Sequence, residues 1–225
     1  MFRMRRKHIL LRLCKRHILH GYEILVPPVA LDYDHWTRAQ AETYMQWYAD
    51  HVQERAAYVS KIAFGKPVQG KIAPESLLDL WKWFYKTAEI EKVPEEIIRQ
   101  EREMYAQFGE SFVSKIQFTV RTEYILRDIA MYMSAVFLTN HPTLYWDIVT
   151  KPKREVFYNK PVLRGFLNMR YGKPFKSVFQ PDHMIQVQAC KCLDSSGTTQ
   201  DLWNLYALWK QDVPEQNLEG EQDVQ

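Results

Sequence analysis

The segment SFVSKIQFTVRTEYILRDIAMYMSAVFL, residues 111–138, decides the fold. Its apolar side chains return every three or four positions, which predicts one long amphipathic helix over the whole segment. The apolar residues become denser toward Leu138, so we expect that end of the helix at the centre of the core. Glu123 and Arg127 stand four positions apart, in the order that favours an ion pair on a helix. The predicted buried stripe consists of Phe112, Val113, Ile116, Val120, Tyr124, Ala130, Met133 and Phe137.

Three further helices are predicted before this segment. Thr37 and Gln40 have the spacing of a capping box, and apolar residues then recur at helical spacing, which predicts a helix over 37–62. Proline followed by glutamate opens each of the next two, because proline suits the first helical turn and an acid suits the positive end of the helix dipole. These helices are predicted over 74–88 and 94–108.

After Pro142 the pattern changes from helical spacing to short runs that are rich in aromatic and β-branched residues. Such runs, separated by turn residues, predict a small antiparallel hairpin or meander near residues 144–166. The other predicted elements are strands at 144–149 and 155–158, a loop at 168–181, a helix over 182–192 that Asp182 caps, and a last helix that begins at Thr198 or Thr199.

Together these elements predict a mainly α, or α+β, fold with a core of about six helices. A single, mostly helical domain is predicted over 22–211. Residues 1–21 form a basic amphipathic segment, since residues 1–22 hold seven lysines or arginines and no acid. The whole chain has a net charge of +3, so the rest of it is mildly acidic. Residues 212–225 are acidic and without apolar periodicity, which predicts a disordered tail.

The cysteine content favours a reducing compartment. The chain has three cysteines, an odd number without the spacing of a disulfide framework, and we expect all three as free thiols. No apolar run reaches the roughly 18 residues of a membrane span. The basic start of the chain resembles a secretory signal poorly, because charges interrupt its apolar run. A cytoplasmic location is therefore expected.

The usual signatures of catalysis and of cofactor binding do not occur in the sequence. It lacks the phosphate-binding glycine motifs, the G-x-S-x-G elbow and the H-E-x-x-H zinc motif. His17 and His20 share a helical spacing, and His183 precedes Cys190 and Cys192, but neither group has the spacing of a zinc module. We therefore expect no metal and no cofactor, and the sequence favours a protein that is not an enzyme.

The leading hypothesis is a non-catalytic protein-interaction or inhibitor module, of the kind that an immunity protein represents. Aromatic residues make up 14% of the chain, and the body is acidic, which favours a basic protein partner. Trp81 and Trp83 lie on opposite faces of the helix over 74–88. One of them is expected at the surface, and Trp83 is the candidate binding residue, because tryptophan is enriched in binding hot spots.

Two other hypotheses stay open. The first is an enzyme of unknown class with a site between the helix over 111–138 and the hairpin, in which Glu123, Arg127, His141 and Asp147 would act. The second is a peripheral protein that binds an anionic membrane weakly, or nucleic acid, through residues 1–20. A solvated basic face is the simpler interpretation of that segment, and the acidic body gives no firm nucleic-acid signal.

Overall fold

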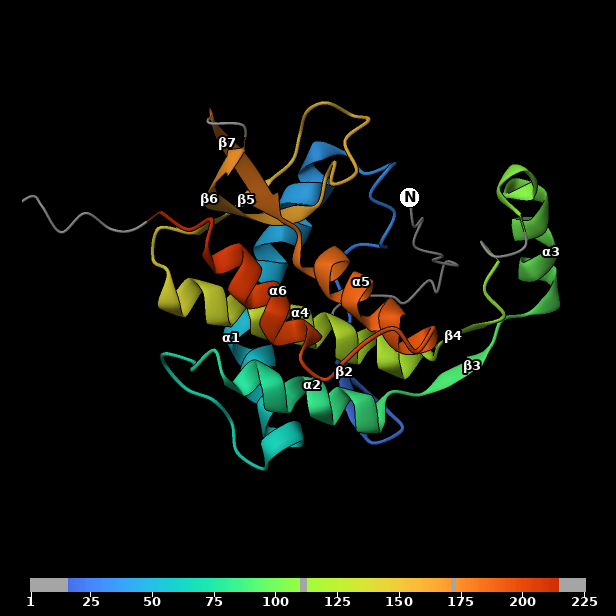
Figure 1. Ribbon diagram of the computed structural model, residues 1–225, viewed down its shortest axis with the longest axis horizontal. Helices are drawn as coiled ribbons and strands as arrows, with labels where there is room; N and C mark the ends of the chain where they lie inside the picture. The colour runs from blue at the N-terminus through green and yellow to red at the C-terminus, as the bar shows by residue number, and fades with distance from the viewer. Residues whose placement is uncertain (1–15, 110–112, 171–172, 215–225) are drawn as a thin grey trace, which may run out of the picture.

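The computed structural model describes residues 16–109, 113–170 and 173–214, and within these ranges the chain has an α+β fold with six α-helices (Figure 1). The predicted fold class is confirmed. The helices are α1 (Arg38–Phe64), α2 (Ser76–Thr87), α3 (Glu95–Met104), α4 (Val120–Asn140), α5 (Pro181–Leu193) and α6 (Asp201–Lys210), with a short 3-10 helix η1 (Ala106–Phe108). The strands are β1 (Arg16–Leu19), β2 (Tyr22–Leu25), β3 (Ile90–Lys92), β4 (Ile116–Phe118), β5 (Tyr145–Ile148), β6 (Pro161–Arg170) and β7 (Lys173–Phe179).

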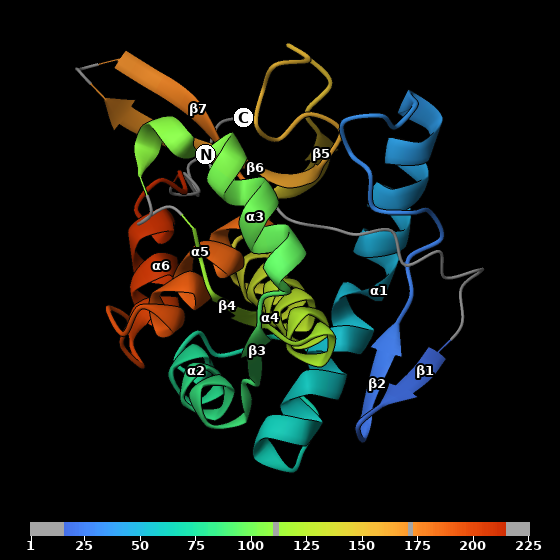
Figure 2. The same cartoon turned by 90° about the vertical axis from the view of Figure 1, so that its right-hand side faces the viewer.

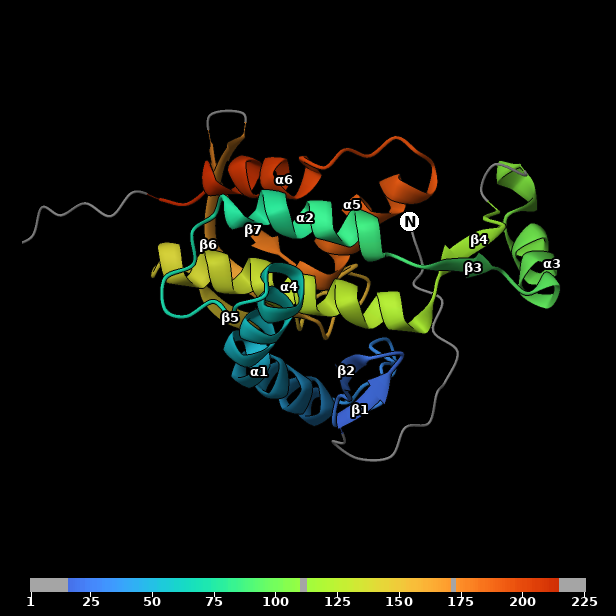
Figure 3. The same cartoon turned by 90° about the horizontal axis from the view of Figure 1, so that it is seen from below.

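Helix α4 is the axis of the core. Every residue from Ile125 to Phe137 is buried, as the rising apolar density predicts. Helices α1 and α5 pack directly against it, and Figure 3 shows α4 between α1 on one side and α2 with α6 on the other. A helix that is covered on all faces is typical of the centre of a domain. No helix in the described ranges is long and apolar enough to span a bilayer.

The predicted start of this central helix at residue 111 is wrong. Thr119 is its N-cap, and the Thr119 hydroxyl accepts a hydrogen bond from the Thr122 amide at 3.3 Å. The backbone of Thr119 is extended, as an N-cap requires, so the helix cannot continue backward through it. The residues before it form β4, which pairs with β3 and buries Phe118 against Phe84. Residues 111 and 112 lie outside the described ranges.

Helix α1 begins where the sequence predicts. The Thr37 hydroxyl accepts from the Gln40 backbone amide at 3.3 Å, and the Gln40 side-chain Oε1 accepts from the Thr37 backbone amide at 2.9 Å, so the capping box is confirmed. Gly65 ends the helix with a φ of 76°, a conformation that glycine adopts without a steric penalty.

A tight hairpin of β1 and β2 opens the described chain. Its turn, His20–Gly21, has positive φ at both residues, which suits a two-residue hairpin loop. Leu19 pairs with Tyr22 across this turn. Strand β1, residues 16–19 of the predicted basic segment 1–21, thus pairs with β2. Residues 1–15 lie outside the described ranges.

The antiparallel sheet predicted near 144–166 is present, with strand order β5-β6-β7. Two details differ from the prediction. Residues 155–158 form a bend and a turn in place of the predicted strand, with only an isolated bridge from Tyr158 to Val149. The predicted loop at 168–181 holds the end of β6 and all of β7. Pro174 disfavours a strand at this position, because proline has no backbone amide to donate. Strand β7 lies at the edge of the sheet, where the missing donor is tolerated.

Two helices close the fold. The predicted cap Asp182 is wrong, since the Gln180 side chain accepts from the His183 amide at 2.5 Å and Pro181 occupies the first helical turn of α5. The predicted cap of the last helix, Thr198 or Thr199, is also wrong: Gln200 is the N-cap of α6 and makes no side-chain cap hydrogen bond, and the Thr198 hydroxyl instead donates to Asp201 at 2.9 Å. Asp212, placed by the sequence in a disordered tail, accepts from the Leu167 amide at 2.6 Å, and residues 215–225 lie outside the described ranges.

Candidate functional site

The chain between α2 and α4 forms an arm that stands away from the body (Figures 1 and 3). We define the arm as residues 89–109 and 113–119. Strands β3 and β4 form its stalk, and α3 lies at its tip. The stalk is a two-stranded sheet of its own, so each strand has one unpaired edge.

The tip of the arm has its own small apolar cluster, separate from the main core. Val93, Ile98 and Val113 are buried in it, and Ile97 packs against them. Such satellite clusters hold a projecting segment together without connecting it to the rest of the core. The arm is therefore a preformed protrusion with an internal packing of its own.

The surface of the arm combines negative charge with exposed apolar side chains. Helix α3 contains four glutamates and two arginines, and only Ile98 of its residues is buried. All three residues of β3 are exposed, Ile90 by 54%. Met104, at the end of α3, is exposed by 57%. Exposed apolar side chains of this kind can supply the apolar part of a protein contact, with the charged side chains around them as its polar rim.

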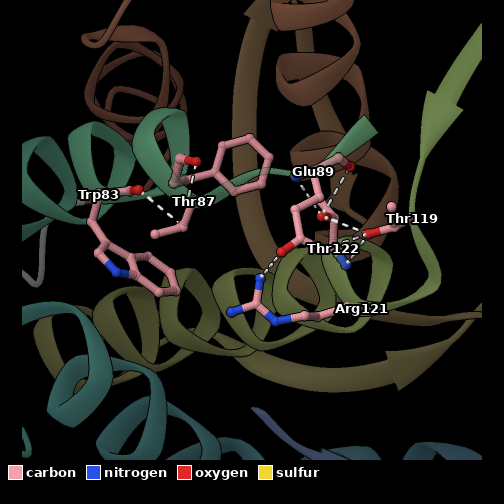
Figure 4. Close-up of polar contacts among 7 residues, drawn as sticks. Trp83, Thr87, Glu89, Thr119, Arg121 and Thr122 are labelled. Atoms are coloured by element: carbon pink, nitrogen blue, oxygen red, sulfur yellow. Dashed lines mark hydrogen bonds and ion pairs between the residues drawn. The ribbon is translucent and has the colours of Figure 1, made fainter. Parts of the chain in front are cut away.

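A cluster of hydrogen bonds fixes the arm to the body, as Figure 4 shows. The Glu89 amide donates to the Thr122 hydroxyl at 2.9 Å, and the Thr119 amide donates to the Glu89 carbonyl at 3.0 Å. Arg121 donates to the Glu89 carboxylate at 3.0 Å. These bonds join Glu89, the residue before β3, to the N-cap and the first turn of α4. They therefore fix the base of the arm to the body.

Trp83 lies near this base, on the last turns of α2 (Figure 4). It is partly buried and packs against the core, and its carbonyl accepts from the Thr87 hydroxyl at 3.0 Å. Trp81, in contrast, is fully buried and stacks on Phe84 with ring centroids 4.6 Å apart. The prediction that one of the two faces outward therefore identifies Trp83, and its binding role stays a prediction.

Arg127 lies inside the body, where α4, α1 and α5 meet. It is exposed by only 9%, and the Tyr124 ring lies 5.1 Å from its guanidinium carbon. Asp182, at the start of α5, is exposed by 8% and accepts from the Tyr48 hydroxyl at 3.1 Å. Burial raises the pKa of Tyr48, Asp182 adds to this and Arg127 opposes it, so both charges act on the same hydroxyl.

The other residues of the enzyme hypothesis have separate partners. Glu123 lies one turn before Arg127 and accepts from Gln186 of α5 at 3.5 Å. His141 follows the last turn of α4 and contacts the Tyr206 hydroxyl at 3.1 Å. Asp147 accepts from Arg164 of the neighbouring strand. Among the described residues, no hydrogen bond or ion pair joins His141 to Asp147, or either of them to Arg127.

The geometry shows no other obvious centre for chemistry. A shallow depression of about 590 Å³ lies along the first half of α1, and none of the five candidate residues lines it. In the described ranges no three His, Cys, Asp or Glu side chains gather as they would around a metal ion. Cys190 and Cys192 are free, and burial raises the pKa of both thiols, which disfavours the reactive thiolate.

Sequence reasoning missed the arm and Asp182 as candidates. The segment 94–108 reads as one more core helix, and only the charge of α3, with one apolar position in three or four, indicates an exposed element. Comparisons of the chain with protein-family models, with curated proteins and with solved structures found no match.

Proposed function

We propose that this protein is a non-catalytic interaction module that binds a basic protein partner through the arm. The observation that supports this proposal most is the arm itself: a preformed protrusion with its own apolar cluster, fixed at its base and acidic at its tip. A protrusion that is rigid before binding loses less conformational entropy when it docks.

The charge of α3 favours a partner with a positive surface. Opposite potentials accelerate encounter and disfavour wrong partners. Ile90 and Met104 would supply the apolar part of the contact, because burying them removes exposed hydrocarbon from water. Trp83 lies close to the base of the arm and would extend the surface onto the body.

In its sharper form the proposal is an inhibitor, which acts as an immunity protein does by covering a basic active-site surface of another protein. We also propose a cytoplasmic location, with which the free thiols of Cys190 and Cys192 agree. In the enzyme hypothesis, Glu123 and Arg127 lie one turn apart on α4, but His141 and Asp147 contact Tyr206 and Arg164, which does not support a site shared by all four. The membrane or nucleic-acid hypothesis depends on residues 1–20, most of which lie outside the described ranges.

Charge reversal tests the proposal. The tagged full chain is used to recover partners from a native lysate, beside the double variant Glu95→Lys/Glu103→Lys. Both glutamates are exposed on α3, so the change should leave the fold intact. We expect a stoichiometric, basic partner with the natural chain and its loss with the variant, because the attraction becomes repulsion.

The matched control is Glu75→Lys/Asp79→Lys, which makes the same charge change on exposed positions of the body beside α2. This control should recover the partner as well as the natural chain does. If both double variants lose the partner equally, net charge rather than the arm determines binding. If no partner is recovered at all, the proposal fails.

A further inference from the structure

The charge of the chain is unevenly distributed, and the three-stranded sheet lies in a basic region. Residues 143–180, which contain β5, β6 and β7, hold eight lysines or arginines and only two acids, a net charge of +6. The whole chain has a net charge of +3 and residues 1–22 carry +7, so the segments 23–142 and 181–225 together carry −10. Positive charge that is concentrated in one part of a fold indicates a surface that attracts anions.

Five of these cations have no partner among the described residues. Their side chains are exposed and make no hydrogen bond or ion pair there, unlike Arg38, which pairs with Glu42, or Arg99, which pairs with Glu96. The five lie in the loop between β5 and β6 and on β7: Lys151, Lys153, Arg154, Lys173 and Lys176. Because no described carboxylate neutralises them, their charge remains available to an anion in solution.

The same sheet carries exposed aromatic side chains. Among the phenylalanine, tyrosine and tryptophan side chains that the structure describes, only two are largely exposed, Tyr145 of β5 by 55% and Phe175 of β7 by 59%. Their exposure is unusual in a chain whose aromatic rings otherwise pack in or against the core. An exposed ring supplies a flat apolar face, on which the planar base of a nucleic acid stacks.

Strand pairing places Tyr145 and Lys176 on one face of the sheet. Leu163 of β6 pairs with Phe179 of β7, and both are fully buried, so their face points into the core. Side chains alternate between the two faces along a strand. Arg164, which pairs with Tyr145, and Lys176, three positions before Phe179, therefore lie on the outer face.

Further cations lie at both ends of this face. Lys151, Lys153 and Arg154 belong to the loop that follows β5, whereas Lys173 and Phe175 lie on the first half of β7, at the far end of β6. Strand β6 has ten residues, so the two groups are separated by about 30 Å along the sheet. The sheet and the arm lie on opposite sides of the body (Figures 1 and 3), so the basic and the acidic surface are separate.

We propose that this basic surface, formed by the loop 149–160 and by strands β5 to β7, binds single-stranded nucleic acid. Its cations neutralise phosphates, and Tyr145 and Phe175 stack on unpaired bases. The base faces of a duplex are covered by its own stacking, and an acidic protein segment has no bases, so the exposed rings favour a single strand over both. The surface is independent of the arm and of residues 1–20, and it adds a second partner to the function proposed above.

Fluorescence anisotropy of the full chain with labelled probes tests this surface. The probes are RNA and DNA single strands of about 12 nucleotides and mixed sequence, the DNA duplex of the same sequence, and poly-L-glutamate as the acidic peptide. We expect a single strand to bind at least about tenfold more tightly than the duplex or poly-L-glutamate, because only the single strand offers phosphates and free bases together. RNA and DNA share this chemistry, and the two single strands distinguish them as sources.

Charge reversal then locates the phosphates. Lys153→Glu/Lys176→Glu should weaken the single strand at least about tenfold, and the slope of log affinity against log salt should become shallower by about 1, because phosphates lose their cations. The matched control is Lys66→Glu/Lys71→Glu, which makes the same change between α1 and α2 and should have a much smaller effect on both quantities. All four lysines are exposed, so the fold should stay intact.

Replacing the rings tests the stacking. Tyr145→Leu and Phe175→Leu should each weaken the single strand about fivefold or more, and the salt slope should stay unchanged, because a ring is lost without any change in charge. Ile62→Ala removes exposed apolar surface from α1 and should leave binding unchanged. An unchanged salt slope distinguishes the loss of stacking from a general disruption of the basic surface.

The proposal is overturned if neither single strand binds, or if the duplex or poly-L-glutamate binds as tightly as the single strands do. Equal losses in the two lysine double variants would assign the binding to net charge and reject the surface. The variant Arg5→Glu/Arg6→Glu covers the basic start of the chain. Loss of binding in this variant, together with unchanged binding in Lys153→Glu/Lys176→Glu, would also reject the surface.

Discussion

Arg55 is fully buried, and its partner Asp128 lies 73 positions further along the chain. The pair links α1, α4 and the first hairpin, because Tyr22 and Glu23 of β2 complete its hydrogen bonds. A complete buried ion pair adds little to the free energy of unfolding, because both charges lose their hydration. Removing one partner is costly, because the other charge then stays buried without a counterion. The pair therefore specifies how these three elements are joined.

Asp128→Asn should accordingly destabilise the protein by about 3–5 kcal/mol, since Arg55 keeps its charge without a counterion. Urea unfolding of the full chain, followed by tryptophan fluorescence and by circular dichroism, measures this loss. Asp147→Asn is the matched control and should cost only about 0–1 kcal/mol, because its pair with Arg164 lies at the surface. Equal losses in the two variants would refute the structural role of the buried pair.

Two histidines give the stability a pH dependence. Burial lowers the pKa of His141 below its ordinary value of 6.5, with Lys210 and Lys71 adding to the effect. Burial also lowers the pKa of His183, as does Lys160. Below pH 6.5 the unfolded chain therefore binds protons that the folded chain does not. The contribution of these histidines to the unfolding free energy is fully present above pH 6.5 and is lost as the pH falls below that value.

We expect the unfolding free energy to decrease between about pH 7.5 and pH 5.5, and the decrease should be smaller in His141→Gln/His183→Gln. Urea titrations of both proteins across this range provide the comparison. The difference between the two curves isolates the histidines from the carboxylates, which titrate at lower pH. A difference that stays constant over the whole range would contradict the assignment.

At the residue scale, the sequence predicts what is local. The Thr37–Gln40 capping box depends on four adjacent residues and is confirmed. The pairing of Arg127 with Glu123 rests on helical spacing alone and stays a prediction, whereas the interaction of Arg127 with Asp182 joins two different helices and has no local signal. Contacts such as Arg55–Asp128 join positions far apart in the chain, and no periodicity encodes them.

At the element scale, the Thr122 hydroxyl contributes two of the hydrogen bonds that anchor the arm. The Thr122 hydroxyl accepts from the Glu89 amide and donates to the Glu89 carbonyl at 3.1 Å. Thr122 is fully buried, so its replacement by the isosteric valine leaves the Glu89 amide without this acceptor, while the Glu89 carbonyl keeps its bond from the Thr119 amide. Leaving a buried backbone donor unpaired costs about 1–3 kcal/mol.

Thr122→Val should therefore loosen the stalk. Hydrogen exchange measured by mass spectrometry should become faster in peptides that cover β3 and β4, and it should stay unchanged in α1. Thr87→Val is the control, because the Thr87 hydroxyl bonds only within its own helix, to the carbonyls of Trp83 and Phe84. Identical exchange in β3 and β4 for the natural chain and Thr122→Val would show that the hydroxyl does not anchor the arm.

Elements were predictable where one period dominates a long stretch. Helix α1 and the core half of α4 follow from helical spacing. The start of α4 was missed because Phe118 and Ile116 fit both a helical stripe and a short strand. Strand β7 was missed because Gly172 and Pro174 are turn residues, and its pairing with β6 is a tertiary contact that overrides this local preference.

At the scale of the whole molecule, the order of predicted helices and strands predicts an α+β domain with a helical core, and the structure has one. This pattern does not predict that the arm, residues 89–109 and 113–119, projects from the body, since the apolar spacing of its helix is that of any amphipathic helix. Whether such a helix packs on the body or projects from it depends on whether the body has an apolar surface left for the helix to cover. That is a property of the assembled fold. The function proposed for the protein depends on this one feature.

Site-specific photocrosslinking in native lysate tests the arm most directly, with the crosslinker placed at Ile90 of the arm or at Ile62 of α1. Both isoleucines are exposed, by 54% and 43%. The arm proposal predicts one dominant, basic protein crosslinked from Ile90 and absent from Ile62. Crosslinking of the same protein from both positions, or from Ile62 alone, would contradict it, as would the absence of any crosslink from Ile90.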